Sequence, residues 1–499
     1  KRLVLGRDHF GVKPLYWGVF KDTLIFASEM KAVYEHPKFI KNIDPQAIDD
    51  LMTLMFIPTP RTVYQGLYKL ESGHLLVAEA AGTIEKRRFW DHGKHLESAR
   101  RERLGDILER LDAKISECVS LALRSDVPLG VFLSGGIDSA TIAYYAKRHL
   151  SQVDTFSVYF KQESFSERWE ARQTASMLGT RHHEIMMDFP DDIPAFAEKV
   201  LAVFDEPFAD PSALPTYLLS EATKRHVTVA LSGDGGDELF GGYPTFVASD
   251  ILTVWNRLPA FLRKGLAVRL AGLLPSRFER VSLDYQMKRF IQTASEHPDP
   301  AQAHFSWRGA LLWSQRRELY TKEFFAQVAS RPAYADLIPA NGVSGMERFF
   351  LADLEVYLRD EFLVKVDRMS MAHALEVRPP MLDPELASMA LGIDEDLKVN
   401  GFETKWILRR LMRGRIPMSV LNAKKTGFSP PLAQWFLQPR FQDFFKESIS
   451  ASPMRSLGII DEAYAKGLLA AHSAGRQDNS RQLWTLIALA MFAKRHASR

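Results

Sequence analysis

Short apolar runs separated by glycine and proline mark the first 90 residues of the chain. Apolar positions gather in residues 2–5, 23–27 and 74–77, each bounded by polar or turn residues. Runs this short, punctuated in this way, are typical of strands and turns. We therefore predict that the chain begins with a mostly-β region.

The sequence between residues 91 and 106 becomes charged, which is typical of an exposed connection between domains. Beyond it, apolar strand-like runs alternate with helical patterns, and the predicted strands are residues 128–133, 155–160, 184–187 and 227–231. This alternation predicts an α/β fold with a parallel sheet and helices on both of its faces. We place the first domain at residues 1–95 and the second at residues 96–499.

Beyond Gly242 the pattern is helical to the end of the chain, with breaks at Pro259, Pro275, Pro298 and Gly342. This pattern predicts a helical layer over one end of the sheet. The apolar run at residues 483–493 has about half of the roughly 20 residues that a membrane-spanning helix needs. We therefore expect that run to be a buried helix and predict no membrane association.

Composition narrows the class of protein. With 499 residues and 46% hydrophobic content, the chain can bury one large core or two ordinary ones, as expected of a multidomain enzyme. The 64 Lys and Arg residues and 61 Asp and Glu residues are interspersed, so no basic stripe suggests nucleic acid. The single cysteine, Cys118, excludes an intrachain disulfide and a CxxC site, which favours the reducing cytoplasm.

A predicted strand ends in a glycine pair and opens directly into a helix. The segment reads Leu133-Ser134-Gly135-Gly136-Ile137-Asp138-Ser139. Glycines let backbone N–H groups approach phosphate oxygens, and the start of the helix adds positive potential. Asp138 needs a cation between itself and phosphate, which predicts that it holds Mg²⁺. The alternative is an ordinary turn in which Asp138 or Ser139 caps the helix.

A second loop follows the predicted strand at residues 227–231 and crowds three carboxylates among glycines. It reads Ser232-Gly233-Asp234-Gly235-Gly236-Asp237-Glu238. Carboxylates this close repel each other unless a cation is near. A solvated acidic turn is the alternative, although apolar residues flank the loop on both sides. Because both loops follow parallel strands, they lie at the edge where such sheets bind ligands, and one nucleotide can contact both.

The first loop resembles that of the ATP pyrophosphatases, and the pair resembles the asparagine synthetase family. The resemblance implies that the first loop grips pyrophosphate and the second closes the site for AMP and aspartate. The implied ATP contacts are Leu133, Ser134, Gly135, Gly136, Asp138, Ser139, Val158, Ser232 and Gly233, with Mg²⁺ on Asp138 and Asp237. Asp234 falls where many members carry a glutamate tied to forming the aspartyl adenylate, and Glu238 is implied to bind substrate.

Three later segments resemble further signatures of the family. Residues 363–371 and 375–383 match K-x-D-R-x-x-M and L-E-x-R-x-P-x-L-D, which makes Glu376 a catalytic candidate and Arg378 a substrate-binding one. Without the resemblance, Lys365 and Arg368 would favour a solvated ion-pair face. Residues 425–431 match K-x-G-F-x-x-P and align Lys425 with a lysine that neutralises charge as pyrophosphate leaves. The alternative for Lys425 is an ordinary surface lysine.

The beginning of the chain resembles the later half of a class II glutamine amidotransferase domain, in residues 6–16, 26–31, 58–62 and 88–91. That family uses an N-terminal cysteine as nucleophile and places its glutamine-binding residues upstream of these segments. Cys118, in a helical run, is expected to be structural. We therefore expect the chain to lack the start of this domain, including its nucleophile.

The resemblance implies a glutamine-hydrolysing asparagine synthetase that uses ATP and Mg²⁺, with glutamine or ammonia as nitrogen donor and aspartate as acceptor. The predicted reaction passes through β-aspartyl-AMP and releases AMP and pyrophosphate. Two alternatives stay open: a relative that amidates another carboxylate, of a surface polysaccharide or peptide, and a non-catalytic regulatory relative. A homodimer is one option for the oligomeric state.

Overall fold

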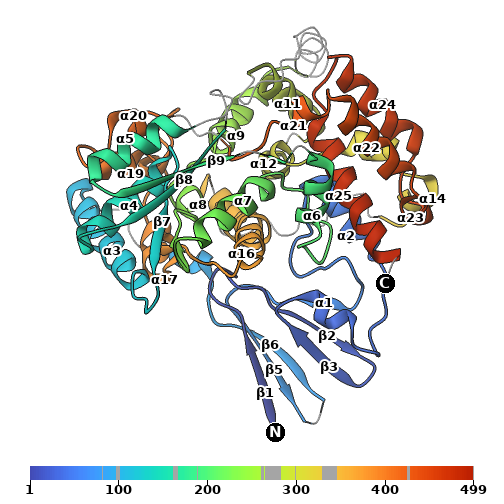
Figure 1. Ribbon diagram of the computed structural model, residues 1–499, viewed down its shortest axis with the longest axis horizontal. Coiled ribbons are helices and arrows are strands. Elements are labelled where there is room, and N and C mark those ends of the chain that lie inside the picture. The colour runs from blue at the N-terminus through green and yellow to red at the C-terminus, as the bar shows by residue number, and fades with distance from the viewer. Residues whose placement is uncertain are drawn as a thin grey trace.

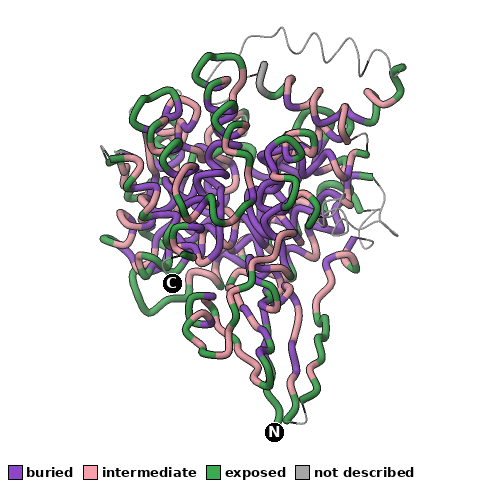
Figure 2. The backbone as a smooth tube through the Cα atoms, turned by 90° about the vertical axis from the view of Figure 1, so that its right-hand side faces the viewer, coloured by how far each residue is buried: buried purple, intermediate pink, exposed green. Residues whose placement is uncertain are grey.

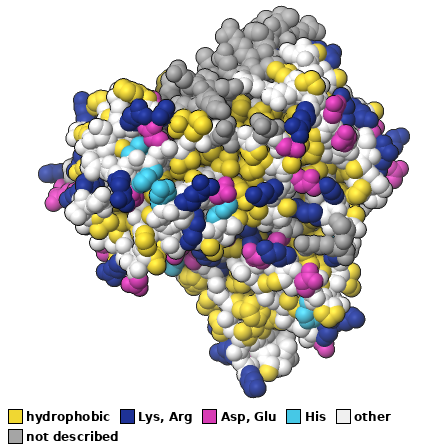
Figure 3. Space-filling model, viewed as in Figure 1, with side chains coloured by type: hydrophobic (Ala, Val, Ile, Leu, Met, Phe, Trp, Pro, Cys, Tyr) yellow, Lys and Arg dark blue, Asp and Glu magenta, His cyan; other side chains and the backbone are white. Residues whose placement is uncertain are grey.

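The computed structural model describes residues 1–80, 82–96, 102–160, 167–187, 189–190, 192–259, 263, 283–297, 299–328, 345–423 and 427–497. Three groups of elements follow one another along the chain: a pair of antiparallel sheets, a parallel sheet with its helices, and a C-terminal group of helices (Figure 1). None of the described helices is long and apolar enough to cross a membrane. On the face drawn in Figure 3, charges of both signs are interspersed.

The first 90 residues form two antiparallel sheets of three strands, in the orders β1-β5-β6 and β3-β2-β4. Their elements are β1 (Arg2–Gly6), β2 (Tyr16–Phe20), β3 (Thr23–Ala27), α1 (Met30–Tyr34), α2 (Pro45–Leu54), β4 (Leu67–Lys69), β5 (His74–Glu79) and β6 (Ile84–Arg88). The β-rich character of this region is confirmed. Residues 97–101, within the charged connection, lie outside the described residues, so the domain boundary stays a prediction.

Five parallel strands form the central sheet, in the order β11-β10-β7-β8-β9. They are β7 (Leu129–Phe132), β8 (Asp154–Phe160), β9 (Arg181–Met187), β10 (Val229–Leu231) and β11 (Glu376–Arg378). The predicted α/β fold is confirmed, and four of the five strands coincide with the apolar runs. The strand β11 departs from the purely helical pattern expected beyond Gly242. It has only three residues, too few to show a period, and it is ordered by pairing with β10.

Alternate strand residues enter two different cores, so helices cover both faces of the sheet. Val131 and Leu231 pack in the core that contains α4, whereas their neighbours Phe132 and Ala230 pack with Leu219 of α7. The helices α3 (Leu104–Ala122), α4 (Ile137–His149) and α5 (Arg168–Leu178) contribute to the first core. The helices α7 (Ala213–Lys224) and α16 (Leu363–Met371) contribute to the second core, and α6 (Ile193–Leu201) packs against α7. Cys118 is buried in α3, where burial raises the pKa of its thiol.

The remaining elements that the structure describes are helices, as predicted for the chain beyond Gly242. They are η1 (His92–His95), α8 (Gly236–Phe240), α9 (Pro244–Trp255), α11 (Leu283–Glu296), α12 (Pro300–Arg308), α13 (Trp313–Leu319), α14 (Lys322–Phe325), α15 (Glu347–Ala352), η5 (Asp353–Phe362), η6 (Pro380–Leu382), α17 (Pro384–Leu391), α18 (Glu395–Lys398), α19 (Trp406–Met412), α20 (Met418–Leu421), α21 (Leu432–Trp435), α22 (Pro439–Ser450), α23 (Ser452–Ser456), α24 (Glu462–Ser473) and α25 (Ser480–Ala497). The apolar run at residues 483–493 lies in α25 and is buried, which confirms a core helix. Buried residues fill the interior of the molecule, and exposed ones lie around its periphery (Figure 2).

The antiparallel sheets are fixed to the rest of the molecule by ion pairs and hydrogen bonds. Lys69 pairs with Glu206 at 2.5 Å, and Lys13 pairs with Asp367 at 2.8 Å. The carboxylate of Asp360, on the helix η5, accepts hydrogen bonds from the backbone N–H and hydroxyl of Thr59 at 2.8 and 2.6 Å. Partly buried pairs of this kind hold the two regions in one orientation.

Candidate active site

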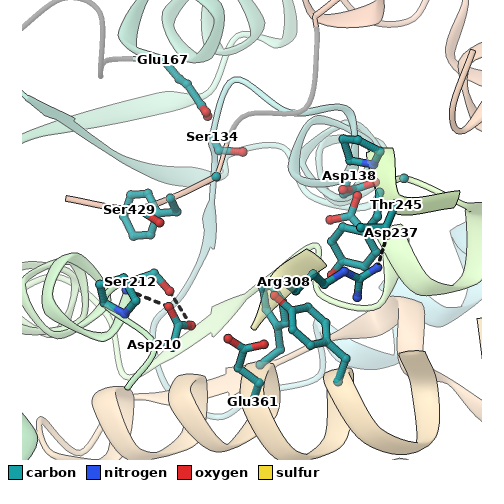
Figure 4. Close-up of a pocket in the computed structure, with 18 of the residues that line it drawn as sticks. Ser134, Asp138, Glu167, Asp210, Ser212, Asp237, Thr245, Arg308, Glu361 and Ser429 are labelled. Carbon is teal, nitrogen blue, oxygen red and sulfur yellow. Dashed lines mark hydrogen bonds between the residues drawn. The ribbon is translucent and has the colours of Figure 1, made fainter. Parts of the chain in front are cut away.

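A cavity of about 1780 Å³ lies where the parallel strands end. Leu133 and Ser134 line it just after β7, Val158 lines it from β8, and Gly233 and Asp234 line it just after β10. This is the carboxyl edge of the sheet, where open α/β sheets bind ligands. Figure 4 shows Ser134, Asp138 and Asp237 on one side of the cavity and Asp210, Ser212 and Glu361 on the other.

The first glycine loop is closed on itself by its two serines. The Ser134 N–H donates to the Ser139 hydroxyl at 3.0 Å, the two hydroxyl oxygens lie 2.9 Å apart, and the Gly136 N–H donates to Ser134 Oγ at 3.1 Å. The helix α4 begins at the next residue, and its N-cap residue is Gly136, which has no side chain. Ser139 Oγ also donates to the carbonyl oxygen of Gly136 at 3.1 Å, so this serine ties the loop to the first turn of the helix.

A carboxylate already contacts the backbone of this loop. The Gly135 N–H donates to Glu167 Oε2 at 3.1 Å, and a Cβ on Gly135 would lie 2.9 Å from Glu167 Cβ. The approach is possible only because Gly135 carries no side chain. The loop therefore presents a backbone N–H to an anionic oxygen, which is the property that phosphate binding requires.

The second glycine loop packs directly on Asp138 of the first. A Cβ on Gly233 would lie 2.8 Å from Asp138 Cβ, and a Cβ on Gly236 would lie 2.5 Å from Asp138 Oδ1. Gly235 has a φ of 91°, a left-handed conformation that side chains disfavour. These glycines are needed for close approach, and the approach brings Asp138 and Asp237 together.

Lys405 lies between the two aspartates. Its Nζ pairs with Asp138 and, at 2.5 Å, with Asp237 Oδ1, and its side chain is only 5% exposed. A Cβ on Gly242 would lie 2.2 Å from Lys405 Cε, so the lysine side chain packs directly against the backbone of Gly242, where no side chain intervenes. This ammonium group is the cation that the crowded carboxylates require, and the loop is not a solvated acidic turn.

Glu238, the residue after Asp237, also lines the cavity and contacts Tyr243, which precedes α9. Its Oε1 accepts a hydrogen bond from the Tyr243 hydroxyl at 2.5 Å. Burial, reinforced by the neighbouring charge of Asp237, raises the pKa of Glu238. Glu238 therefore adds a buried carboxyl group to the lining of the cavity, next to the second glycine loop.

The opposite wall is built from paired charges on helices. Lys365 Nζ donates to Asp210 Oδ2 and Ser212 Oγ, both at 2.8 Å. Arg308 makes two hydrogen bonds of 2.8 Å to Asp353 and lies 4.1 and 4.4 Å from the ring centres of Tyr243 and Tyr357. Each cation is held by a carboxylate, with Lys365 buried and the side chain of Arg308 11% exposed, which fixes the shape of this wall.

The cavity brings together most residues that the sequence assigns to it: Leu133, Ser134, Asp138, Ser139, Val158, Gly233, Asp234, Asp237 and Glu238. Gly135, Gly136 and Ser232 lie in the same two loops, where Ser232 Oγ donates to Asp234 Oδ2 at 2.8 Å. Lys425 lies outside the described residues, so its role stays a prediction. The functional roles of the other residues also stay predictions.

Glu376 and Arg378 are not among the residues that line the cavity, and their expected catalytic and substrate-binding roles stay predictions. Both lie on β11, whose middle residue Val377 lines the cavity. Because successive side chains of a strand point to opposite faces, the residues on either side of Val377 point away from the cavity. Arg378 Nε instead donates to Glu376 Oε1 at 2.6 Å, and Arg378 Nη1 donates to the carbonyl oxygens of Ala122 and Arg124 at the end of α3.

Several cavity residues carry no signal that sequence reasoning could use. Arg308, Glu361 and Asp210 belong to no motif that we recognise. Lys405, which lies behind the cavity lining and pairs with Asp138 and Asp237, precedes an ordinary basic helix. Lys365 and Arg368 belong to the K-x-D-R-x-x-M signature, and without that resemblance they would favour a solvated ion-pair face. The structure buries both and separates them, with Lys365 in the cavity and Arg368 bound to Glu29 at 3.1 Å and to the carbonyl oxygen of Ser28 at 3.0 Å.

A parallel sheet whose strand-end loops combine anion-binding backbone with paired aspartates defines a nucleotide-dependent enzyme of the ATP-pyrophosphatase type. The asparagine synthase family model matches residues 110–494, and a glutamine amidotransferase domain model matches residues 1–90. The chain belongs to the asparagine synthase family. It is therefore a ligase of the family whose chemistry is ATP-dependent amidation.

Relatives of this chain include proteins with different names. It is 33% identical to asparagine synthetase (glutamine-hydrolyzing) 1 of Bacillus subtilis (strain 168), over 96% of this chain and 73% of that protein. It is 26% identical to asparagine synthetase (glutamine-hydrolyzing) 3 of the same organism, over 85% and 64% of the two chains. It is 24% identical to the amidase chry2 of Gibberella zeae, over 92% and 72%.

Proposed function

We propose that this protein is a glutamine-dependent asparagine synthetase that activates the side-chain carboxylate of aspartate with ATP. The observation that carries the proposal is the meeting of the two glycine loops over one cavity, with Asp138 and Asp237 joined through Lys405. The name of the Bacillus subtilis relative, which is 33% identical, supports glutamine and aspartate as substrates. A homodimer and a cytoplasmic location stay predictions from the sequence.

Mg²⁺ fits the residues that form this pair. Carboxylate oxygens are the protein ligands that Mg²⁺ prefers, and in nucleotide sites one or two of them act together with phosphate oxygens. Asp138 and Asp237 offer two such groups, and their pairing with the ammonium group of Lys405 supports a cation-binding role for them. When bound there, the ion would neutralise charge on the pyrophosphate.

In the proposed first step, a carboxylate oxygen of aspartate attacks the α-phosphorus of ATP. The bond from that phosphorus to the oxygen bridging to the β-phosphate breaks, and pyrophosphate leaves. The backbone of the first loop and the hydroxyls of Ser134 and Ser139 bind the departing phosphates, while Leu133 and Val158 contact the adenosine. The product is β-aspartyl-AMP, in which the acyl carbon carries a good leaving group.

In the second step, the lone pair of ammonia attacks the acyl carbon, the acyl C–O bond breaks, and asparagine, AMP and a proton are released. Val12 and Lys13 of the first region lie next to Asp234, with a void of about 10 Å³ between them that has room for about one water molecule. Asp234 lines the large cavity as well. We therefore assign Asp234 to the acyl adenylate and to the incoming nitrogen.

Pyrophosphate release from Mg·ATP tests the proposal, with ammonium as the nitrogen source. We expect release to depend on aspartate and to be accompanied by asparagine and AMP in equal amounts. Pyrophosphate release that does not respond to aspartate would reject this acceptor. Release of ADP and phosphate instead would reject adenylation itself.

A second candidate function is amidation of a carboxylate larger than aspartate. The observation that favours it is an apolar stretch of the cavity wall contributed by Ile251, Trp255, Met287, Phe290 and Trp307. Apolar wall of this kind is typical of pockets for larger ligands. The same assay with a uronic acid or a carboxylate-bearing peptide in place of aspartate separates the two functions.

A further inference from the structure

The helix η5 (Asp353–Phe362) is a π-helix, and it forms the floor of the cavity. A π-helix has more residues per turn than an α-helix, so side chains four apart lie nearly in line along it. Asp353, Tyr357 and Glu361 follow this spacing, and the last two line the cavity. Figure 4 shows Glu361 directed from this floor toward the space beneath the nucleotide loops. Short π-helical segments occur frequently at functional sites.

Glu361 is a buried carboxyl group with spare capacity to accept hydrogen bonds. The residue is 5% exposed, a hydrogen bond with Tyr357 favours its charged form, and its Oε2 has no hydrogen-bond partner among the described residues. Burial, strengthened by the charge of Asp210, raises the pKa of Glu361 to about 8. The ionised form is costly here because the carboxylate loses hydration, and a cation bound directly to it would offset that cost. The position therefore favours a positively charged ligand.

The protein cations that act on Glu361 are held by other carboxylates. Lys365 and Arg308 both stabilise its charged form at a distance. Lys365 donates to Asp210 at 2.8 Å, and Arg308 donates to both oxygens of Asp353 at 2.8 Å. A cation that binds Glu361 directly would therefore come from the contents of the cavity.

We propose that Glu361 binds the ammonium group of the acceptor, so that the acceptor of this enzyme is a carboxylate that also carries a free amino group. This inference rests on the proposed function and narrows it, because it separates amino acids from sugar acids and simple dicarboxylates. The amino group would lie on the floor of the cavity, and the reacting carboxylate would point up toward the first glycine loop. An uncharged or purely anionic acceptor would leave Glu361 buried and unmatched.

The experiment compares aspartate with succinate, which is the same dicarboxylate without the amino group, in the wild-type protein and in Glu361→Gln. Pyrophosphate release is followed with ammonium and Mg·ATP. We expect the wild type to favour aspartate in kcat/KM, and Glu361→Gln to lower that value for aspartate by about 30-fold or more. The value for succinate should stay within about 3-fold, since succinate makes no contact that the substitution removes. Glu361→Asp should recover part of the preference for aspartate.

The matched control is Glu355→Gln, because Glu355 lies on the same helix but pairs with Arg88 at 2.6 Å and does not line the cavity. It should leave kcat/KM for both acceptors unchanged.

Equal losses for aspartate and succinate in Glu361→Gln would overturn the inference, because they would indicate a structural role. A raised KM for ammonium with an unchanged KM for aspartate would also overturn it, since Glu361 would then bind the nitrogen donor. A wild type that releases no pyrophosphate with aspartate rejects the proposed function, whereas one that uses aspartate and succinate equally well rejects only this inference.

Discussion

The two walls of the cavity are built in different ways. The nucleotide wall consists of two short loops, each contiguous in sequence, whose glycines allow Asp138, Asp237 and Lys405 to meet. The opposite wall, which we call the acceptor wall because it contains Glu361, is formed by single side chains from the segment before α7, the end of α12 and the helix η5. A loop that must approach backbone to phosphate needs glycine at fixed positions, whereas a wall of side chains only needs complementary charges. The nucleotide wall is therefore specified by short sequence motifs, whereas the acceptor wall is specified by the packing of helices that are distant in sequence.

The largest expected effect concerns the nucleotide wall. Asp138→Asn should lower pyrophosphate release by about 10³-fold, because it removes a carboxylate that faces the departing phosphates and pairs with Lys405. Steady-state assays at saturating ATP measure the loss. The control is Asp154→Asn at the opposite end of the sheet, where Asp154 pairs with Arg181 at 2.5 Å and should leave the rate within about 3-fold. Equal losses in the two variants would show that the wall has no special role.

Lys405 tests whether the nucleotide wall depends on its internal cation. Lys405→Met removes the cation that pairs with buried Asp237 and with the mostly buried Asp138, and should lower the free energy of unfolding by about 3 kcal/mol. Mg²⁺ alone should restore part of this loss in the variant but not raise the stability of the wild type. Urea denaturation with and without Mg²⁺ measures both effects.

The matched control for Lys405 is another buried lysine. Lys398 is fully buried, burial lowers its pKa to about 7, and its Nζ lies 4.6 Å from the ring centre of Phe350. Lys398→Met should not make the stability respond to Mg²⁺, since Lys398 Nζ donates to the carbonyl oxygen of Leu391 at 3.4 Å. The carboxylates of Glu347, Glu395 and Asp394 act on it only at longer range, and none forms an ion pair with it in the described part of the chain. A response to Mg²⁺ in Lys398→Met as well would show that the ion acts elsewhere.

The acceptor wall should make stability depend on pH. The pKa of Glu361 rises from 4.5 to about 8 on folding, so the folded state binds more protons than the unfolded state between these values. Stability from this group is therefore present near pH 4.5 and lost as pH rises toward 8, by about 1.4 kcal/mol for each unit of pKa shift. Urea denaturation at pH 5 and pH 8 should show that Glu361→Gln becomes more stable relative to the wild type at the higher pH. A relative gain at the lower pH would contradict the assignment.

The smallest effect is expected on β11, outside both walls. Glu376→Gln and Arg378→Lys should each change kcat/KM for aspartate by less than about 3-fold, because these side chains bind each other and the end of α3. The same pyrophosphate assay measures the change. A loss near that of Asp138→Asn would instead support the catalytic role predicted for Glu376.

Local sequence determined the α/β fold, four of the five parallel strands, the buried helix α25 and both nucleotide loops. These features depend on short-range rules: apolar periodicity for strands and helices, and glycine where backbone approaches a ligand. The β-rich character of the first region follows from the same rules, because its apolar runs are short and separated by turns, whereas the antiparallel pairing of its strands is known only from the structure.

Only the tertiary structure decided which side chains meet. Lys405 lies 267 residues from Asp138 in the chain, and Lys365 lies 155 residues from Asp210, so no local pattern connects them. Tertiary pairing also created β11, and its alternation turned Glu376 and Arg378 away from the cavity while Val377 faces it. A motif records which residues a loop needs, but the direction of a side chain depends on the strand or helix that carries it. The acceptor wall therefore took its form from packing among distant helices.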